Sequence, residues 1–459
     1  MKDRRITTTA RVLLTLLNVG LFAWVWIAYY NNIAYHTYLL RGNIVSILIY
    51  YVLYSWLTRL YRGFAIASSP VEETVLSQFI SFGISDLILY VTAVLLYRDY
   101  VNIWPGAFIV ACQLVGSTLI VWLSKRYMLS HIQPSETLLI YGGRSTAAQA
   151  EQFKARISEK FSHLFRLNSA PLSNAVGETE ALIDGYETIM FMGISPEDRD
   201  RLAQHCLSQR KVFYFVPEFA DIIYHGCTVK NFLDTPLMRY EYNFDRHRNY
   251  VVKRVFDLVF SAVLLVLLSP VFLVSAIAIK LEDHGPVFFL QKRVTQDGKV
   301  FPIVKFRSMV VDAERYGALP ATQNDPRITK VGAILRRYRI DETPQLINIL
   351  LGQMSFVGPR PERTLHETLY EQDLPEFKYR LRVKGGLTGY AQVYGKYNTS
   401  PEDKLKLDML YIENQSLVLD VKLILLTIKI MFKPESTEGF DQTRSEAINR
   451  EDRGHSESA

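Results

Sequence analysis

Cysteine is scarce in this chain of 459 residues, which has only Cys112, Cys206 and Cys227. Their spacing contains no close pair, so the sequence suggests neither a disulfide framework nor a zinc site. A large excess of one charge is also lacking, since the formal net charge is +6, and no residue pattern of a nucleic-acid-binding module occurs. We therefore expect anionic headgroups and phosphates as partners, and no nucleic acid.

Long apolar runs, in contrast, are abundant, because 49% of the residues are hydrophobic. Four runs near the amino terminus have about the length needed to cross a bilayer: 12–30, 43–58, 78–97 and 101–124. The first run lacks a small-residue cleavage site, so we expect an anchor and not a cleaved signal peptide. Basic residues precede the first run and follow the second and fourth, which predicts that both ends of this bundle are cytoplasmic.

Asp86 is an acidic residue inside the third apolar run. Carboxylates within membrane segments are costly and often functional, so Asp86 could serve as a relay or a substrate contact. The alternative interpretation is a carboxylate that faces the bundle interior and pairs within the fold. The sequence leaves both interpretations open.

From Glu136 onward the pattern becomes that of a small α/β domain. Residues 137–143 are typical of a buried strand that ends in a glycine turn, and further strands are expected at 188–193 and 211–216. This pattern predicts a Rossmann-like domain of doubly wound type. The dinucleotide fingerprint is incomplete, because Ala147 and Ala148 stand at the end of the turn, so a structural or regulatory role is favoured.

A second kind of apolar segment, residues 258–279, has no charge and is interrupted by Ser269 and Pro270. Proline removes a backbone donor, so the helix should bend there, and Ser269 can help to satisfy the freed carbonyls. Basic residues lie on both sides of the run: Lys253, Arg254, Lys280, Lys292 and Arg293. We therefore predict a re-entrant helix over residues 255–281 that enters and leaves the bilayer by the cytoplasmic face.

Two adjacent carboxylates, Asp341 and Glu342, stand between a cluster of arginines and the expected start of a helix. Thr343 is a good N-cap and Pro344 a good first helical residue, so both acids should lie just outside the helix amino terminus. Free amides and the helix dipole make such an end attractive to phosphate. Taken alone, the two acids are better interpreted as favouring the helix dipole or pairing with Arg336 and Arg337.

Cationic side chains elsewhere in the last third change that balance. Lys305 and Arg307 share one face of an expected strand, and a rigid proline turn presents Arg360. The glycine-rich stretch 385–389 is expected to form a flexible loop able to approach an anion. Together with a membrane anchor, these features indicate a site for two phosphorylated substrates.

Eight segments, in this order, carry a resemblance to a known family: 253–257, the Ser269-Pro270 break, 285–289, 305–309, 325–329, 340–346, 357–361 and 386–393. Over residues from 253 to about 432 the chain resembles the catalytic domain of the bacterial sugar transferases, the monotopic polyprenyl-phosphate phosphoglycosyl transferases. By layout, the amino-terminal half resembles the larger members of that family. Gly385 departs from the proline of many members, which predicts a more flexible loop, and Asp420 is expected to be structural.

The resemblance implies a covalent route in which Asp341 attacks the β-phosphorus of a UDP-sugar, UMP leaves, and undecaprenyl phosphate accepts the hexose phosphate. It implies Mg²⁺ held by Asp341 and Glu342. It also implies substrate-phosphate binding by Lys305, Arg336 and Arg360. Arg307, on the same strand face as Lys305, is expected to bind substrate phosphate with them. The expected product is the first lipid-linked sugar of an exopolysaccharide, capsule or O-antigen, with glucose or galactose favoured, made at the cytoplasmic face of the bacterial plasma membrane.

The predicted fold is an α/β membrane protein in four parts: a four-helix transmembrane bundle (1–130), the Rossmann-like domain (131–245), the catalytic domain (246–434) and a disordered tail (435–459). Two other hypotheses remain. The glycine turn would suit a membrane-anchored nucleotide-sugar oxidoreductase or dehydratase, and the amino-terminal half would suit a scaffold for polysaccharide assembly. A homo-oligomer is left open.

Overall fold

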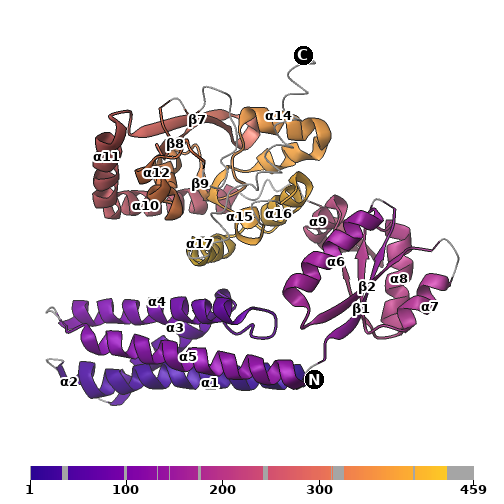
Figure 1. Ribbon diagram of the computed structural model, residues 1–459, viewed down its shortest axis with the longest axis horizontal. Helices are drawn as coiled ribbons and strands as arrows, with labels where there is room; N and C mark the ends of the chain where they lie inside the picture. The colour runs from indigo at the N-terminus through magenta and orange to yellow at the C-terminus, as the bar shows by residue number, and fades with distance from the viewer. Residues whose placement is uncertain are drawn as a thin grey trace. The chain divides into compact units, whose positions relative to one another are not determined.

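The computed structural model describes residues 2–33, 40–97, 101–131, 133–143, 145–173, 177–240, 247–311, 313, 325–395 and 399–431. The chain divides into two compact units, Met1–Pro217 and Glu218–Ala459. Figure 1 labels their helices and strands. The predicted tail 435–459 lies outside the described residues.

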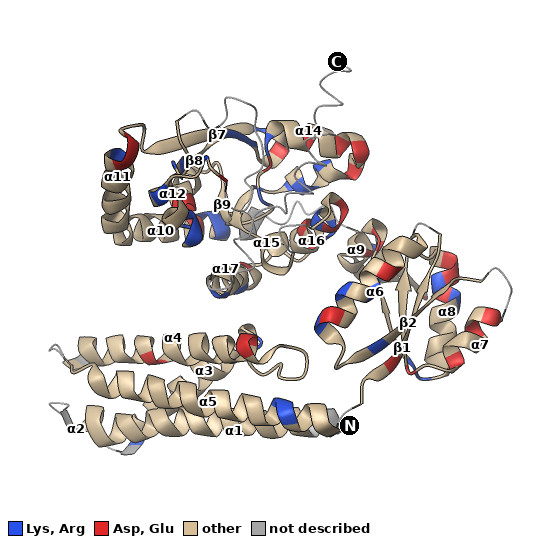
Figure 2. Cartoon of the chain, in the orientation of Figure 1, with Lys and Arg blue, Asp and Glu red and all other residues tan. Residues whose placement is uncertain are grey.

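The first unit begins with helices that confirm the prediction of four segments able to cross a membrane, over Ile6–Tyr30, Arg41–Leu60, Val71–Leu95 and Trp104–His131. Their elements are α1 (Lys2–Val25), the π-helical turn η1 (Trp26–Tyr30), α2 (Asn31–Ile33), α3 (Leu40–Leu60), α4 (Val71–Tyr97) and α5 (Trp104–His131). Helix α4 starts before its apolar run, because Glu72 and Glu73 in its first turn favour the helix dipole. Charged residues are sparse along these helices (Figure 2).

Polar side chains join the helices of this bundle from within. The Asn18 amide donates to the Tyr54 hydroxyl at 3.1 Å and to Ser117 Oγ at 3.2 Å, and Tyr54 donates to Gln78 Oε1 at 2.7 Å. Such bonds between helices replace water that a bilayer does not supply. Asp86 also faces the interior, but neither carboxylate oxygen has a well-formed hydrogen bond among the described residues.

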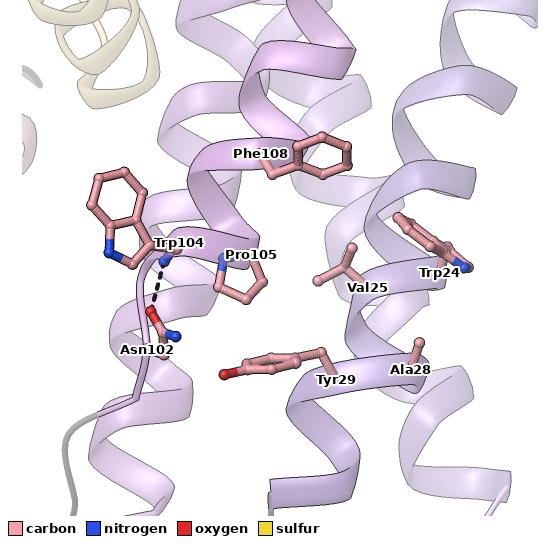
Figure 3. A pocket seen from close by; sticks show the side chains of 8 residues that line it. All are labelled: Trp24, Val25, Ala28, Tyr29, Asn102, Trp104, Pro105 and Phe108. Atoms are coloured by element: carbon pink, nitrogen blue, oxygen red, sulfur yellow. Dashed lines mark hydrogen bonds between the residues drawn. The ribbon is translucent and has the colours of Figure 1, made fainter.

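Aromatic side chains line an open groove of about 450 Å³ where α1 and η1 meet the start of α5 (Figure 3). Trp24, Tyr29, Trp104 and Phe108 surround it, and Asn102 Oδ1 accepts a hydrogen bond of 3.0 Å from the Trp104 amide. Tryptophan and tyrosine favour the boundary between membrane and water. The groove is therefore consistent with placing this end of the bundle at a bilayer surface.

The rest of the first unit is a four-stranded parallel sheet with the order β2-β1-β3-β4. Its elements are β1 (Ser135–Tyr141), α6 (Ala147–Phe161), β2 (Phe165–Pro171), α7 (Glu178–Asp184), β3 (Thr188–Met192), α8 (Pro196–Ser208) and β4 (Val212–Phe215). Side chains from alternate β1 positions pack against α7 and α8 on one face and against α6 on the other. Helices therefore cover both faces of the sheet (Figure 1).

The three predicted strands correspond to β1, β3 and β4, whereas β2 was not expected. It is an edge strand whose sequence mixes polar and apolar residues, so it lacks the continuous apolar run of a central strand. The glycine turn after β1 serves close packing, because a Cβ on Gly143 would lie 2.7 Å from the carbonyl oxygen of Gly193. Gly143 also has a φ of 58°, which favours glycine.

The second unit contains the region with the predicted site residues. Its helices are α9 (Phe219–His225), α10 (His247–Leu267), α11 (Ser269–Asp283), α12 (Lys330–Arg337), α13 (Gln345–Leu350), α14 (Thr364–Asp373), α15 (Tyr390–Tyr394), α16 (Pro401–Glu413) and α17 (Leu417–Met431), with 3₁₀ turns η2 (Gln296–Gly298), η3 (Ile340–Glu342) and η4 (Pro375–Arg382). Its strands are β5 (Thr228–Phe232), β6 (Thr235–Arg239), β7 (Phe288–Val294), β8 (Val300–Phe306), β9 (Ser355–Val357) and β10 (Gly386–Thr388). Strands β5–β6 and β7–β8 are antiparallel pairs, and β9–β10 is a parallel pair.

Helices α10 and α11 bend by 59° at the predicted break, as a broken span or a re-entrant loop would. Ser269 Oγ donates to the Val266 carbonyl at 2.7 Å, which confirms the expected satisfaction of a freed carbonyl. Many outer side chains of both helices are apolar and exposed, whereas Phe256 and Phe260 pack against Phe356 of β9. The bent pair is thus anchored on the sheet side and apolar on the other.

The expected flexible loop at 385–389 is wrong, because Gly386–Thr388 forms the buried strand β10. The Gly386 amide donates to the Pro359 carbonyl at 2.9 Å. A Cβ on Gly386 would lie 2.1 Å from the Gly358 nitrogen, so these glycines allow two backbones to touch. Close backbone approach, and not mobility, explains the glycines.

Candidate active site

The acidic pair lies in the 3₁₀ turn η3, directly before helix α13, as the sequence predicted. Arg339 precedes the turn with a left-handed φ of 54°, a conformation that costs a non-glycine residue about 1 kcal/mol. The expected N-cap is wrong, because Thr343 Oγ1 donates backward to the Ile340 carbonyl at 2.7 Å. This bond stabilises the turn that carries the two acids and leaves the helix start without a side-chain cap.

Glu342 is held by three cations, one from its own turn and two from other parts of the unit. Its Oε1 lies 3.1 Å from Lys305 Nζ at the end of β8 and 2.5 Å from Arg360 Nη2, and its Oε2 lies 3.8 Å from Arg339 Nη1. Burial alone would raise the pKa of Glu342, but Arg360 and Lys305 outweigh it and hold this pKa well below its usual value. Glu342 is therefore an anion that fixes the positions of Lys305 and Arg360.

Asp341 has the opposite surroundings, although it is the adjacent residue. No hydrogen bond or ion pair to its half-buried carboxylate is found in the part of the chain that the structure describes. Burial, together with the neighbouring charge of Glu342, raises the pKa of Asp341 to about 6, against the opposing effect of Lys305. The carboxylate is thus ionised at neutral pH and available to react or to coordinate.

The buried side-chain amide of Asn348 joins helix α13 to strand β8, the strand that carries Lys305. Asn348 Oδ1 accepts from the Val304 amide at 2.9 Å, and Asn348 Nδ2 donates to the Pro302 carbonyl at 2.8 Å. Nothing local in the sequence marks Asn348 for this role. The two β8 residues to which it is bonded lie 44 and 46 positions away in the chain.

The four predicted phosphate-binding cations do not all come together. Lys305 and Arg360 meet at Glu342, and Arg336, in the last turn of α12, lowers the pKa of Asp341 by its charge. Arg307 instead is buried and pairs with Asp283 at the end of α11. Its assignment to a substrate phosphate stays a prediction, since it lies with the bent helix and outside this cation cluster.

Two further arginines complete the cluster and were not assigned from the sequence. Arg339 adjoins the acids, and its place in the arginine-rich stretch was a usable signal. Arg293 on β7 donates to the Pro361 carbonyl at 3.0 Å, and burial lowers the pKa of Arg293 to about 10, helped by the charge of Arg360. Arg293 comes close to residues 360–363 only through strand pairing in the folded chain, so no local motif marks it.

Comparison with known proteins covers this same region. A family model described as "Bacterial sugar transferase" matches residues 248–434. A relative from Caulobacter vibrioides, "UDP-glucose:undecaprenyl-phosphate glucose-1-phosphate transferase", is 41% identical over 181 residues, which are 38% of this chain and 68% of the relative. The chain belongs to the bacterial sugar transferase family.

Other members of the family differ in length and in the sugar that appears in their names. The "Exopolysaccharide production protein PSS" of Rhizobium leguminosarum bv. phaseoli is 41% identical over 189 residues, 39% of this chain and 94% of the relative. The "UDP-N-acetylgalactosamine-undecaprenyl-phosphate N-acetylgalactosaminephosphotransferase" of Aeromonas hydrophila is 42% identical over 181 residues, 39% of this chain and 43% of the relative. The matched region therefore covers less than half of this chain and less than half of the Aeromonas relative.

Proposed function

We propose that this bacterial sugar transferase moves a hexose-1-phosphate from a UDP-sugar to undecaprenyl phosphate, giving undecaprenyl-diphosphate sugar and UMP. The observation that carries the proposal is the pair of unlike acids: among the described residues, Asp341 is unpaired, beside a Glu342 held by Lys305 and Arg360. A free carboxylate within a fixed cation cluster suits attack on a phosphate. The relatives' names, which pair undecaprenyl phosphate with a sugar phosphotransferase, support the same reaction class.

In the proposed first step, an oxygen of Asp341 bonds to the β-phosphorus of the UDP-sugar. The bond from that phosphorus to the bridging oxygen breaks, and UMP leaves with the bridging oxygen. In the second step, a phosphate oxygen of the lipid bonds to the same phosphorus, and the bond to Asp341 breaks. Asp341 is regenerated as a carboxylate, as covalent catalysis requires.

The chain's own cations supply positioning and charge stabilisation for these steps. Phosphoryl transfer depends mostly on fixed charges around the transferred group, so groups that are already held in place are effective. Glu342 pairs with both Lys305 and Arg360, and the charge of Arg336 favours the ionised form of Asp341. We assign these three cations to the phosphates of the donor.

Mg²⁺ fits this donor set only with help from the substrate. The described ranges contain no group of three or more His, Cys, Asp or Glu side chains suited to a metal. Mg²⁺, however, is commonly bound by one or two carboxylates plus substrate phosphate oxygens. Asp341 and Glu342 would hold it, and when bound it would neutralise charge on the diphosphate.

The proposed acceptor requires that the site lie at a membrane surface. We propose that α10 and α11 form a re-entrant helix pair in the cytoplasmic leaflet of the bacterial plasma membrane. The 59° bend, the exposed apolar outer side chains and the basic residues on both sides support this placement. The site would then face the cytoplasm, where a soluble sugar nucleotide can reach it.

The proposed product would be the first lipid-linked sugar of a surface polysaccharide, in keeping with the name of the Rhizobium relative. The names of the relatives include both glucose and N-acetylgalactosamine, so the proposal extends to the hexose class, with glucose or galactose tested first.

The test combines membranes containing the protein with UDP-sugars, undecaprenyl phosphate and Mg²⁺, and identifies the nucleotide released. UMP and a lipid-linked sugar are expected, whereas release of UDP would contradict phosphosugar transfer. Asp341→Asn should lower kcat by about 10⁴-fold or more, because it removes the nucleophile. Asp373→Asn, at an exposed carboxylate of α14, is the matched control and should leave turnover unchanged.

A further inference from the structure

Arg380 is a fully buried arginine on η4 that has no part in the steps above. Only 1% of its surface is exposed, and its guanidinium packs 4.7 Å from the centre of the Phe377 ring. A buried charge is tolerated only when it is paired and hydrogen-bonded. The partners of Arg380 therefore indicate what its burial achieves.

One partner is the main chain of the residue that holds Glu342. Arg380 Nη2 donates to the carbonyl oxygen of Arg360 at 2.8 Å. The side chain of Arg360 meets Glu342 Oε1 at 2.5 Å. Arg380 thus grips the backbone at the position from which the Arg360 guanidinium extends.

The other partners of Arg380 fix its own position. Asp408 of α16 accepts from Arg380 Nε at 3.0 Å and lies 2.9 Å from Nη2, and Glu367 of α14 lies 3.4 Å from Nη1. Asp408 is itself buried, so neither member of this pair can turn to solvent. The guanidinium is therefore held by residues of two helices, and its third partner is the carbonyl of Arg360.

Neighbouring contacts hold the rest of the Arg360 segment. Lys404 of α16 pairs with Glu362 at 2.7 Å, and Arg293 donates to the Pro361 carbonyl at 3.0 Å. Burial would raise the pKa of Glu362, but Lys404 and Arg380 outweigh it and lower this pKa to about 2. These two contacts hold the residues that follow Arg360, whereas Arg380 contacts the carbonyl of Arg360 itself.

We propose that Arg380 is a positioning residue, which holds the Arg360 backbone so that the Arg360 guanidinium meets Glu342 and the phosphates of the donor. This inference rests on the proposed function, because Arg380 can affect turnover through Arg360 only if Arg360 acts on the substrate. Arg380 does not touch substrate. It acts through Arg360.

A double-mutant cycle tests the inference in the full-length protein in membranes. Arg380→Ala alone should lower kcat/KM for the UDP-sugar by about 10- to 100-fold, the range for a hydrogen bond to a charged group. In an Arg360→Ala background the same change should cost less than about threefold, because its target is already gone. If Arg360→Ala turns over too slowly, the cycle is measured on the equilibrium affinity for the UDP-sugar.

Equal losses in both backgrounds would overturn the inference, since a general loss of stability does not depend on Arg360. Methylguanidinium, which matches the removed group, should restore part of the activity of Arg380→Ala and none in the Arg360→Ala, Arg380→Ala double variant. Arg382→Ala is the matched control, because Arg382 lies on the same turn but pairs with Glu413 and Tyr240. Wild-type protein without UMP release would instead refute the proposed function, which keeps the two failures distinct.

Discussion

At the residue scale, the contrast between Asp341 and Glu342 shows how position decides chemistry for two similar side chains. Glu342 lies among cations that keep its pKa low, whereas burial raises the pKa of Asp341 to about 6. The strongly paired acid is poorly suited to attack phosphorus, because its charge is already shared by Lys305 and Arg360. The unpaired acid keeps its electrons available, which is why we assign it the reaction.

Glu367 offers a test of the buried charges around Arg380 that is independent of catalysis. Burial raises the pKa of Glu367 from 4.5 to about 7, because Arg380 compensates it only in part and Glu367 Oε1 is buried with no partner in the described part of the chain. The pKa of Glu367 is thus 4.5 in the unfolded chain and about 7 in the folded protein. Between pH 4.5 and about pH 7 the unfolded chain has lost a proton that the folded protein keeps, so the free energy of unfolding falls as the pH rises. The loss should reach about 3 kcal/mol above pH 7.

We therefore expect Glu367→Gln to be more stable than the wild type at pH 8 and no more stable at pH 5. The measurement is thermal unfolding of both proteins in the same detergent across this range. Asp373→Asn, at an exposed carboxylate of the same helix, serves as the control and should behave as the wild type at both pH values. A gain of the same size at pH 5 and pH 8 would show that ionisation of Glu367 is not the cause.

At the element scale, the bent pair α10 and α11 is the element that we propose to enter the membrane beside the site. The 59° bend follows from Pro270, and Ser269 satisfies a carbonyl at the break. On the inner side, Arg254 of α10 donates to the Ile349 and Leu350 carbonyls at the end of α13, at 2.7 and 2.8 Å. Helix α10 is therefore connected directly to the helix that follows the acidic pair.

Accessibility labelling should show both ends of this bent pair on the cytoplasmic side. Single cysteines at Tyr250 and Lys292, both exposed, are placed in a variant whose three native cysteines are serine. A membrane-impermeant maleimide should label both in inside-out vesicles and neither in intact cells. Ile103→Cys, between α4 and α5, is the control and should react from the outside. Labelling of the two test sites from opposite sides would mean a crossing helix and would contradict the proposed geometry.

At the scale of the whole molecule, the boundary between the two compact units falls after Pro217. Helix α9 follows that boundary and belongs to the second unit, because Ile222 lies in its core with Phe377 and Met409. The Phe219 ring stacks on Tyr379 with centres 5.7 Å apart. These contacts place α9 with the catalytic unit, ahead of the segment that carries the family resemblance.

A fragment of residues 218–459 should therefore keep kcat/KM within about threefold of the full chain, since its core and its site are complete. A fragment of residues 246–459 should unfold about 4–20 °C lower, because loss of Ile222 and Phe219 opens the core and costs about 2–5 kcal/mol. Thermal unfolding and UMP release in matched membranes measure both effects. Equal unfolding temperatures for the two fragments would show that α9 does not stabilise the second unit.

The sequence alone determined the features that depend on neighbouring residues. The long apolar runs, the bend at Pro270 and the location of Asp341 and Glu342 before a helix all follow from local composition and backbone chemistry. Tertiary structure alone decided which charges meet. Lys305 and Arg360 reach Glu342 across 37 and 18 positions, Arg307 turns to Asp283, and Arg380 grips Arg360. Such pairings depend on the packing of distant strands and helices, for which local sequence carries no signal. The same holds for Gly386, which begins strand β10.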